Sequence, residues 1–569
     1  MTRTGADLFV DALEQYDVTR LFGNPGTTEL PLMRALPDSG LAYRLGLHED
    51  IALGMAAGYA CTRRYHSHHD ESVNPLGVVN LHVAPGVAHA LGNLQNAEVN
   101  GVPLLVTAGN HARSFRHEEP ILSGDMVKMT EDYTKWSAEV EHIAALPTMV
   151  RRAVRTALTP PQGPVFLALP MDVMNAETEA NPERLERIAS AGRGDHEAVS
   201  DAADLLARAE DPVLVLGDQV AQSGVDAIDA AVELAEASGA AVYSEMLTAE
   251  INFPPEHDQW IGFTPPDEEV SRGVWRADTL VFIGCSSNAM YIPHEGNLIP
   301  DDPDTVGIGP DAWEVGKNDP VDLSVIGDPG AVMAEVADGV RARVSEADRC
   351  ASSARIEERR AWYRENVLVK DDGSGGDLPS KSALADAIRK TVPEAFVLNE
   401  SNTSKYPLLT RWSLGPEQFL ANKNGGLGFG LPMAVGAADA YREYREEAGV
   451  DDGRPEPRPV VGFISDGSYF YYPQTLYSAV RYDLDLTVVV PDNRNYRILK
   501  DGMLDIYGGS HEDYDYIGMD IDPPIDVAAN AESHGATGTL VAEIEDLEAM
   551  IREAVKTDGP IVVDVLVHD

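Results

Sequence analysis

Apolar residues along the chain follow two alternating spacings. Four residues near the start fall three and four positions apart and predict one face of a helix: Ala6, Phe9, Val10 and Leu13. Short continuous apolar runs follow at 76–83, 103–109 and 164–170, each bounded by turn residues. Such runs are typical of buried parallel strands. The alternation of helices and strands predicts an α/β layer fold.

Two stretches interrupt this alternation and divide the chain. Residues 183–200 are polar, and residues 346–381 are charged and then Gly-rich, so we interpret both as linkers. The fold predicted is α/β, with three doubly wound parallel-sheet domains, which span residues 1–180, 190–345 and 375–569. The first and third domains look like two versions of one layout. The second has no GxGxxG after its first strand-like run, which favours a structural role.

Residues 465–496 hold the strongest local signal for chemistry. A strand-like run ends at Asp466-Gly467-Ser468, a helix-like segment follows, and a second strand-like run ends just before Asn493. A right-handed crossover brings both strand ends to the same edge of the sheet, where ligands of parallel sheets bind. Carboxylate and amide oxygens are ligands that Mg2+ prefers. The spacing therefore predicts a magnesium site formed by Asp466 and Asn493.

Acidic residues outnumber basic ones strongly. Asp and Glu total 93 against 44 Lys and Arg, for a formal net charge of -49. Such a charge repels nucleic acid and anionic membranes, so neither is expected as a partner. The excess is spread through apolar periodic segments, so we interpret it as the acidic surface of a folded, halophilic protein. No run of about 18 apolar residues occurs, so no membrane span is expected.

The cysteines bear on location and on metal binding. Cys61, Cys285 and Cys350 lie far apart without CxxC spacing. This pattern is typical of a protein of the reducing cytosol and indicates no zinc site. A cytoplasmic location is the expectation.

The 465–496 segment resembles the GDG-to-N motif of thiamine-diphosphate-dependent enzymes, with Ser465 in place of the usual first Gly. The resemblance implies thiamine diphosphate and Mg2+ as cofactors. It implies Asp466 and Asn493 as side-chain ligands and the backbone carbonyl of Asn495 as a third, with Gly467 and Ser468 beside the cofactor. It also implies that the three domains are a pyrimidine-binding, a middle and a diphosphate-binding domain.

Other segments match the same family. Glu49 opens a predicted helix rich in small residues, and a Glu there is by itself only a favourable charge at a helix start. With the metal motif present, the resemblance implies that Glu49 activates the cofactor through its aminopyrimidine ring. The stretch 425–438 follows a strand-like region at 399–409. It matches the segment that bends the cofactor, with Leu427 as the wedge and Gly425 as the carbonyl contact. Asn402 and Thr403 match positions near the diphosphate.

The resemblance covers nearly the whole chain and is closest to benzoylformate decarboxylases. Thr27 occupies the position of a serine that binds the substrate carboxylate, and His82 matches one of two catalytic histidines. The second histidine should fall near Tyr291, and His294 stands three residues further on. His89 replaces an expected Asn. The acid-base residues therefore differ from those of a known aryl 2-oxo acid decarboxylase.

The function predicted is thiamine-diphosphate- and Mg2+-dependent decarboxylation of a 2-oxo acid, of the benzoylformate decarboxylase type. One alternative is an acetolactate synthase-like carboligase, because the segment 427–437 resembles those enzymes too. Another is a catalytically altered homologue that only binds the cofactor, which the presence of Glu49, Asp466 and Asn493 disfavours. The family implies a homodimer or homotetramer in which Glu49 and Asp466 meet across a subunit interface. The sequence leaves the particular small-molecule substrate open.

Overall fold

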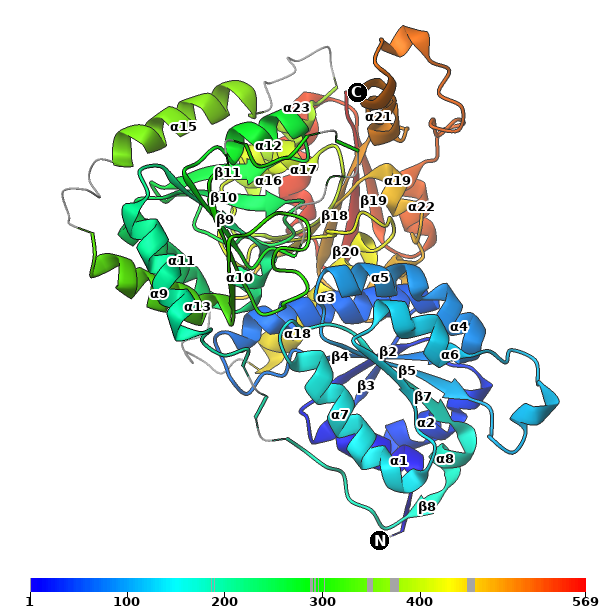
Figure 1. Cartoon of the computed structure of the whole chain (residues 1–569). Helices are drawn as coiled ribbons and strands as arrows, with labels where there is room; N and C mark the ends of the chain where they lie inside the picture. Colours follow the sequence, from blue (N-terminus) through cyan, green and yellow to red (C-terminus); the bar gives the residue numbers. More distant parts are fainter. Residues whose placement is uncertain are drawn as a thin grey trace.

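Three α/β units make up the protein. The computed structural model describes residues 2–185, 187–188, 190–286, 290, 293–294, 296–300, 302–344, 352–368, 378–447 and 456–568. In these residues each unit is built on a six-stranded sheet whose paired strands run parallel, which confirms the predicted fold class (Figure 1). No described helix combines the length and the apolar character needed to cross a membrane.

The first unit has the strand order β3-β2-β4-β5-β7-β6. In that order the strands span Ala42–Leu45, Arg20–Gly23, Gly77–His82, Leu104–Asn110, Val165–Pro170 and Trp136–Glu139. The three apolar runs of the sequence are β4, β5 and β7 at the centre of the sheet, and nearly all of their residues are buried. The predicted helix is α1 (Gly5–Glu14), and its four apolar residues are buried in the core of this unit.

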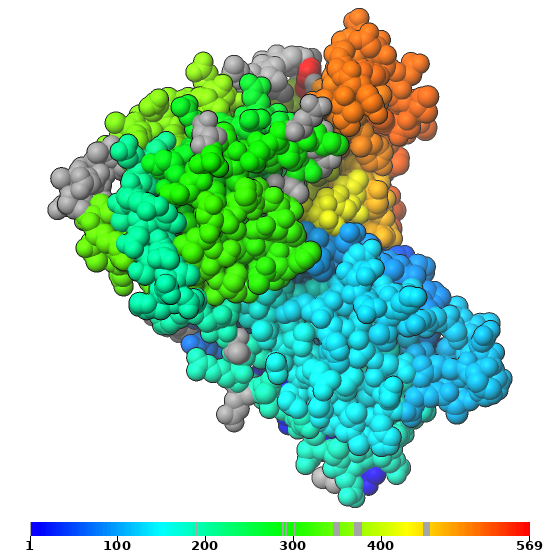
Figure 2. All heavy atoms as spheres, in the orientation of Figure 1, coloured from blue at the N-terminus to red at the C-terminus, as the bar shows by residue number. Residues whose placement is uncertain are grey.

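The middle unit has the order β11-β10-β9-β12-β13-β14. In that order its strands span Trp260–Thr264, Ala241–Met246, Pro212–Leu216, Thr279–Ile283, Asp304–Gly309 and Leu323–Ile326. Helices α9 (His196–Arg208), α11 (Val225–Ser238) and α13 (Pro329–Arg341) pack together beside this sheet (Figure 1). The green surface of this unit meets both of the other units (Figure 2).

The third unit has the order β16-β15-β17-β18-β20-β19. In that order its strands span Phe419–Ala421, Phe396–Glu400, Val460–Ile464, Leu486–Asp492, Pro560–Leu566 and Thr537–Val541. The six strands of each sheet can be numbered 1 to 6 in chain order. The sheets of the first and third units then share the order 2-1-3-4-6-5, whereas the sheet of the middle unit has the order 3-2-1-4-5-6. The predicted likeness of the first and third units is therefore a shared topology.

Helices α3 (Glu49–Ser67) and α18 (Gly430–Glu447) join the first and third units along their length (Figure 1). Their backbones come close where a glycine of each helix faces a methionine of the other. A Cβ on Gly58 would lie 2.0 Å from the carbonyl oxygen of Met433, and one on Gly436 would lie 1.9 Å from that of Met55. The small residues after Glu49 therefore serve this close helix contact.

Buried charges tie the middle unit to its neighbours. Lys423 Nζ donates to Asp218 Oδ2 at 2.8 Å and also contacts Glu245, and all three side chains are buried. Arg64 Nη2 donates to Glu250 Oε1 at 2.6 Å. Because an unpaired buried charge is costly, these pairs fix how the three units dock.

Several segments differ from the sequence prediction. Helix α9 begins at His196, inside the predicted linker at 183–200. Part of the predicted linker at 346–381 is a helix, α15 (Ser352–Asn366), because Ile356 and Tyr363 lie on one face and are buried against the middle unit. The Tyr363 hydroxyl donates to the carbonyl oxygen of Phe263 at 2.7 Å. The predicted strand-like region at 399–409 is a strand only to Glu400, and α17 (Lys405–Arg411) follows.

Candidate functional site

A partly open cavity lies at the carboxyl ends of β15, β17 and β18, where ligands of parallel sheets bind. Seven residues predicted from the sequence line it: Asn402, Thr403, Leu427, Asp466, Gly467, Asn493 and Asn495. Gly425 is not among them and lies exposed in the loop before Leu427 with φ of 78°. Ser468 is buried just behind the cavity, 3.1 Å from Ser465 Oγ.

The side chain of Asp466 is well suited to a cation. Asp466 Oδ1 accepts a hydrogen bond from the backbone of Gly467 at 2.8 Å, whereas Oδ2 is buried and accepts none from the described residues. Burial, followed by the neighbouring carboxyl of Asp492, holds the pKa of Asp466 well above its usual range. A divalent cation would supply the missing partner. The oxygens of Asp466, Asn493 and Asn495 that share this cavity fit Mg2+.

The serine that departs from the family motif is accommodated. Ser465 Oγ donates to the carbonyl oxygen of Glu400 at 3.3 Å, so the extra side chain gains a polar partner. Gly467 lets the ring of Tyr496 approach closely, because a Cβ there would lie 2.8 Å from that ring. The motif thus keeps its close packing at Gly467.

Sequence reasoning missed a lysine in this cavity. Lys381 lies in the first turn of α16 (Lys381–Thr391), and its Nζ donates to Thr403 Oγ1 at 3.1 Å. Arg497 also lines the cavity. Two cationic side chains beside a metal-ligand set suit a phosphate-bearing ligand. Lys381 lies in a segment interpreted as linker, so no local signal marked it.

A buried glutamate holds the loop before α18. Glu400 Oε2 accepts from the backbone N–H of Gly428 and Oε1 from that of Phe429, both at 3.1 Å. Oε1 also accepts from Asn422 Nδ2 at 2.9 Å. Burial raises the pKa of Glu400 to about 7. Glu400 therefore positions the loop that contains Leu427, a role that the sequence did not suggest.

A second cluster lies at the equivalent edge of the first sheet. His82 ends β4, and its Nδ1 lies 2.7 Å from Glu29 Oε2. The Glu29 side chain is 0% exposed and the His82 side chain 21% exposed. Glu29 Oε1 accepts from Thr28 Oγ1 at 2.7 Å and from Gly109 N at 2.9 Å. A buried carboxylate thus orients a partly accessible imidazole.

Glycines and a strained residue allow this pairing. A Cβ on Gly26 would lie 2.2 Å from His82 Nδ1, and one on Gly109 would lie 2.1 Å from Glu29 Oε1. Val83, directly after His82, has φ of 39°, and such strain concentrates at functional sites. Thr28 Oγ1 lies 3.3 Å from His82 Nδ1, whereas the predicted Thr27 is exposed in the same turn.

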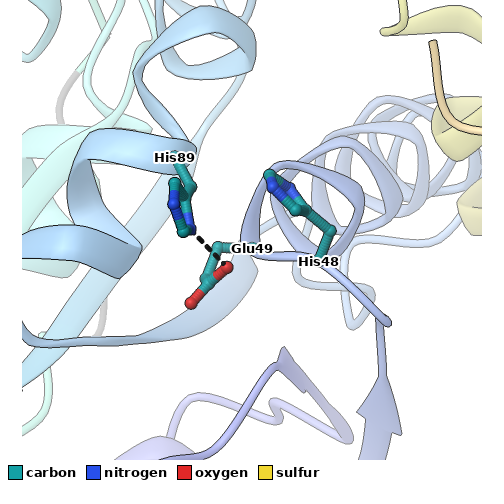
Figure 3. A group of neighbouring side chains, drawn as sticks. All are labelled: His48, Glu49 and His89. Carbon is teal, nitrogen blue, oxygen red and sulfur yellow. Dashed lines mark hydrogen bonds and ion pairs between the residues drawn. The ribbon is translucent and has the colours of Figure 1, made fainter.

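Glu49 is the first residue of α3, and its side chain lies close to His48 and His89 (Figure 3). His89 Nδ1 lies 3.1 Å from Glu49 Oε2, and the rings of His48 and His89 stack with centroids 5.0 Å apart. The Glu49 side chain is 13% exposed. It does not line the cavity around Asp466, whose lining residues all lie between 381 and 567.

The described structure does not test the position at which the resemblance places a second catalytic histidine. Tyr291 lies outside the described residues. His294 is exposed, and its Nδ1 lies 2.8 Å from the carbonyl oxygen of Gly296. The described structure thus places no contact between His294 and the His82–Glu29 pair.

Family models match all three units. The model of the thiamine pyrophosphate enzyme N-terminal TPP binding domain matches residues 3–134, that of the central domain 199–336, and that of the C-terminal TPP binding domain 404–565. The chain belongs to the thiamine pyrophosphate enzymes. Thiamine diphosphate is accordingly the cofactor that its first and third units are built to bind.

Individual relatives span nearly the whole chain. Benzoylformate decarboxylase from Pseudomonas aeruginosa is 29% identical over 561 residues, which are 98% of this chain and 97% of that protein. The large subunit of acetolactate synthase isozyme 3 from Escherichia coli is 24% identical and covers 99% of this chain and 95% of its own length. The structure of a 4-hydroxybenzoylformate decarboxylase from Rhodococcus jostii superposes with a TM-score of 0.83 at 27% identity, over 100% of this chain and 99% of that one.

Proposed function

We propose that the protein is a thiamine-diphosphate- and Mg2+-dependent decarboxylase of a 2-oxo acid. The observation that carries this proposal is the His82–Glu29 pair, because it supplies an oriented acid-base group at the sheet edge of the first unit. The similarity to two enzymes named as decarboxylases of aryl 2-oxo acids supports the same reaction. The units at 1–180, 190–345 and 375–569 would then be the pyrimidine-binding, middle and diphosphate-binding domains.

The third unit holds the diphosphate end of the cofactor in this proposal. Asp466, Asn493 and the backbone carbonyl of Asn495 bind Mg2+. Lys381 and Arg497 lie on the same cavity wall and add positive charge toward the diphosphate. Leu427 packs against the cofactor rings from the loop that Glu400 fixes, and Gly425 offers its carbonyl.

Glu49 acts at the aminopyrimidine end, where it holds a proton at a ring nitrogen. In this family the glutamate serves the cofactor held by a second subunit, and the absence of Glu49 from the lining of the cavity is consistent with that arrangement. The active unit is then a homodimer, or a homotetramer made of two such pairs. Each dimer would contain two sites, with both subunits contributing to each.

Residues of the first unit transfer protons and orient the substrate. Bound thiamine diphosphate supplies the electron sink for loss of CO2 from a 2-oxo acid. His82, oriented by Glu29, moves a proton to or from the reacting substrate. The hydroxyl of Thr27, exposed in the turn beside His82, orients the substrate carboxylate.

Product analysis tests the proposal. Purified protein with thiamine diphosphate and Mg2+ in molar KCl is offered pyruvate, benzoylformate and branched 2-oxo acids, and CO2 and organic products are measured. Release of CO2 with one aldehyde per substrate consumed supports a decarboxylase. A 2-hydroxy ketone or acetohydroxy acid as the main product would instead show that the protein is a carboligase. Absence of turnover with all substrates would contradict the proposal.

A further inference from the structure

Two histidines and a glutamate converge where α3 begins. Among the described residues, His48, Glu49 and His89 form a group of three potential metal ligands, with one ligand atom from each lying within 4.8 Å of the others (Figure 3). His48 and Glu49 are adjacent in the chain, whereas His89 ends α4 (Val83–His89). The tertiary fold alone brings the third ligand to the other two.

We propose that these three residues bind a divalent cation of the zinc class. Two imidazoles and one carboxylate are a ligand set that suits Zn2+ and leaves its fourth position to water. Imidazole ligands favour such borderline cations over Mg2+, which prefers oxygen ligands. The expectation of no zinc site rested on cysteine spacing, whereas this site uses no cysteine.

The local contacts suit a cation. The His48 ring is held by stacking on His89 and by Tyr472, whose ring centroid lies 5.4 Å away. Asp50, next to Glu49, adds a second carboxyl whose Oδ2 accepts from the Tyr472 hydroxyl at 2.7 Å.

Two existing hydrogen bonds involve the proposed ligands. His48 Nδ1 accepts from the backbone N–H of Asp50 at 3.2 Å, and His89 Nδ1 lies 3.1 Å from Glu49 Oε2. Both are long hydrogen bonds, and coordination at a ring nitrogen is stronger than either. In a single chain the His89 side chain is 53% exposed, so the group opens toward the side on which the cofactor is proposed to bind.

One consequence rests on the proposed function. Glu49 cannot ligate zinc and serve the aminopyrimidine at once, so zinc and the cofactor compete for the cofactor-free protein. Zinc would therefore act as an inhibitor that blocks cofactor loading. Binding of the metal does not itself depend on the proposed reaction.

Zinc titration of the full-length, cofactor-free protein tests the site. Isothermal calorimetry in molar KCl should show about one Zn2+ per chain that excess Mg2+ does not displace. His89→Asn and His48→Gln should each raise the Kd at least tenfold. His69→Asn is the matched control, because His69 is also a partly exposed histidine bonded to a carboxylate, 2.8 Å from Glu417 Oε2. Unchanged affinity in His89→Asn, or an equal loss in His69→Asn, would overturn the proposal.

Two further measurements identify the ligands of the zinc and test its competition with the cofactor. Zinc-edge X-ray absorption of the unmodified protein should report two imidazole ligands, and a shell of sulfur or of oxygen alone would overturn the site. Prior zinc loading should raise the apparent Kd for thiamine diphosphate. If zinc binds as expected but the cofactor does not compete, the metal site stands and the role proposed for Glu49 falls.

Discussion

His82 Nδ1 and Glu29 Oε2 lie 2.7 Å apart, although the two residues are 53 positions apart in the chain. The pair forms because β2 and β4 are neighbours in the first sheet, so the residues after both strands meet at one edge. Since Glu29 is fully buried, it fixes the imidazole without reaching the substrate itself.

His82 should therefore matter more than its partner. We expect His82→Ala to lower kcat/KM by about 10²- to 10⁴-fold, the usual contribution of a general acid-base group. Glu29→Gln should cause a smaller loss, mainly in kcat, and should change the pH profile because the imidazole loses its carboxylate. Steady-state kinetics from pH 5 to 9 measure both. Glu183→Gln is the control, since Glu183 pairs with Arg151 away from the site, and an equal loss there would contradict the assignment.

Mixed dimers should reveal shared sites. Glu49→Gln and Asp466→Ala are each expected to be nearly inactive alone. In a dimer with one subunit of each kind, one site contains both changes and the other contains neither. Mixing and reassociation should therefore restore activity in a substantial fraction of sites. Activity that stays at the level of the single variants would show that both residues serve the cofactor of one chain.

Lys381 should contribute to cofactor binding. We expect Lys381→Met to weaken thiamine diphosphate binding about 10- to 100-fold, the value of one hydrogen bond to a charged group. The loss should shrink at higher salt, because screening weakens charge attraction. Fluorescence titration of the cofactor-free protein measures the Kd. Lys390→Met, in the last turn of the same helix, removes a lysine that pairs with Glu548 and should leave the Kd unchanged.

Glu400 should make stability depend on pH. Its pKa is raised to about 7, so its contribution to folding is complete below the usual pKa near 4.5 and is lost as pH rises through 7. Across this pH window the loss in free energy of unfolding that is due to Glu400 is roughly 3 kcal/mol for a fully buried group. The free energy of unfolding of Glu400→Gln should fall less steeply from pH 5 to pH 8 than that of the unmodified protein. Denaturant unfolding at constant KCl checks this, and parallel slopes would refute it.

Salt should stabilise the protein. With a net charge of -49, like charges repel across the folded surface at low ionic strength. At 1 M salt the Debye length is about 3 Å, so most of this repulsion is screened. We expect Tm to rise steadily from 0.1 to 2 M KCl, roughly equally in NaCl. A Tm that stays flat across this range would contradict adaptation to high salt.

Much of the fold could be predicted from the sequence. Apolar runs such as 76–83 and 103–109 became central strands because a strand covered on both faces excludes polar residues. Asp466 and Asn493 were predicted together because parallel strands place their carboxyl ends at one edge. That inference needs only element order and handedness, which local pattern reveals.

Other residues could not be found in this way. Glu400 and Lys381 gained their roles from partners in the loop at 422–430 and at Thr403, and no spacing rule links those positions. The helix α15 was missed because its pattern is highly charged. Contacts with the middle unit stabilise it, among them the burial of Ile356 and Tyr363 and the ion pair of Arg359 with Asp211.

The sequence by itself determined the three α/β units, the acidic composition and the resemblance to thiamine-diphosphate enzymes, because these depend on local pattern and composition. Only the tertiary structure decided which side chains face one another: His82 with Glu29, Glu400 with the loop before α18, and His89 with Glu49. These contacts join residues from separate strands and helices. Their distances depend on how sheets twist and helices pack, which no single segment encodes.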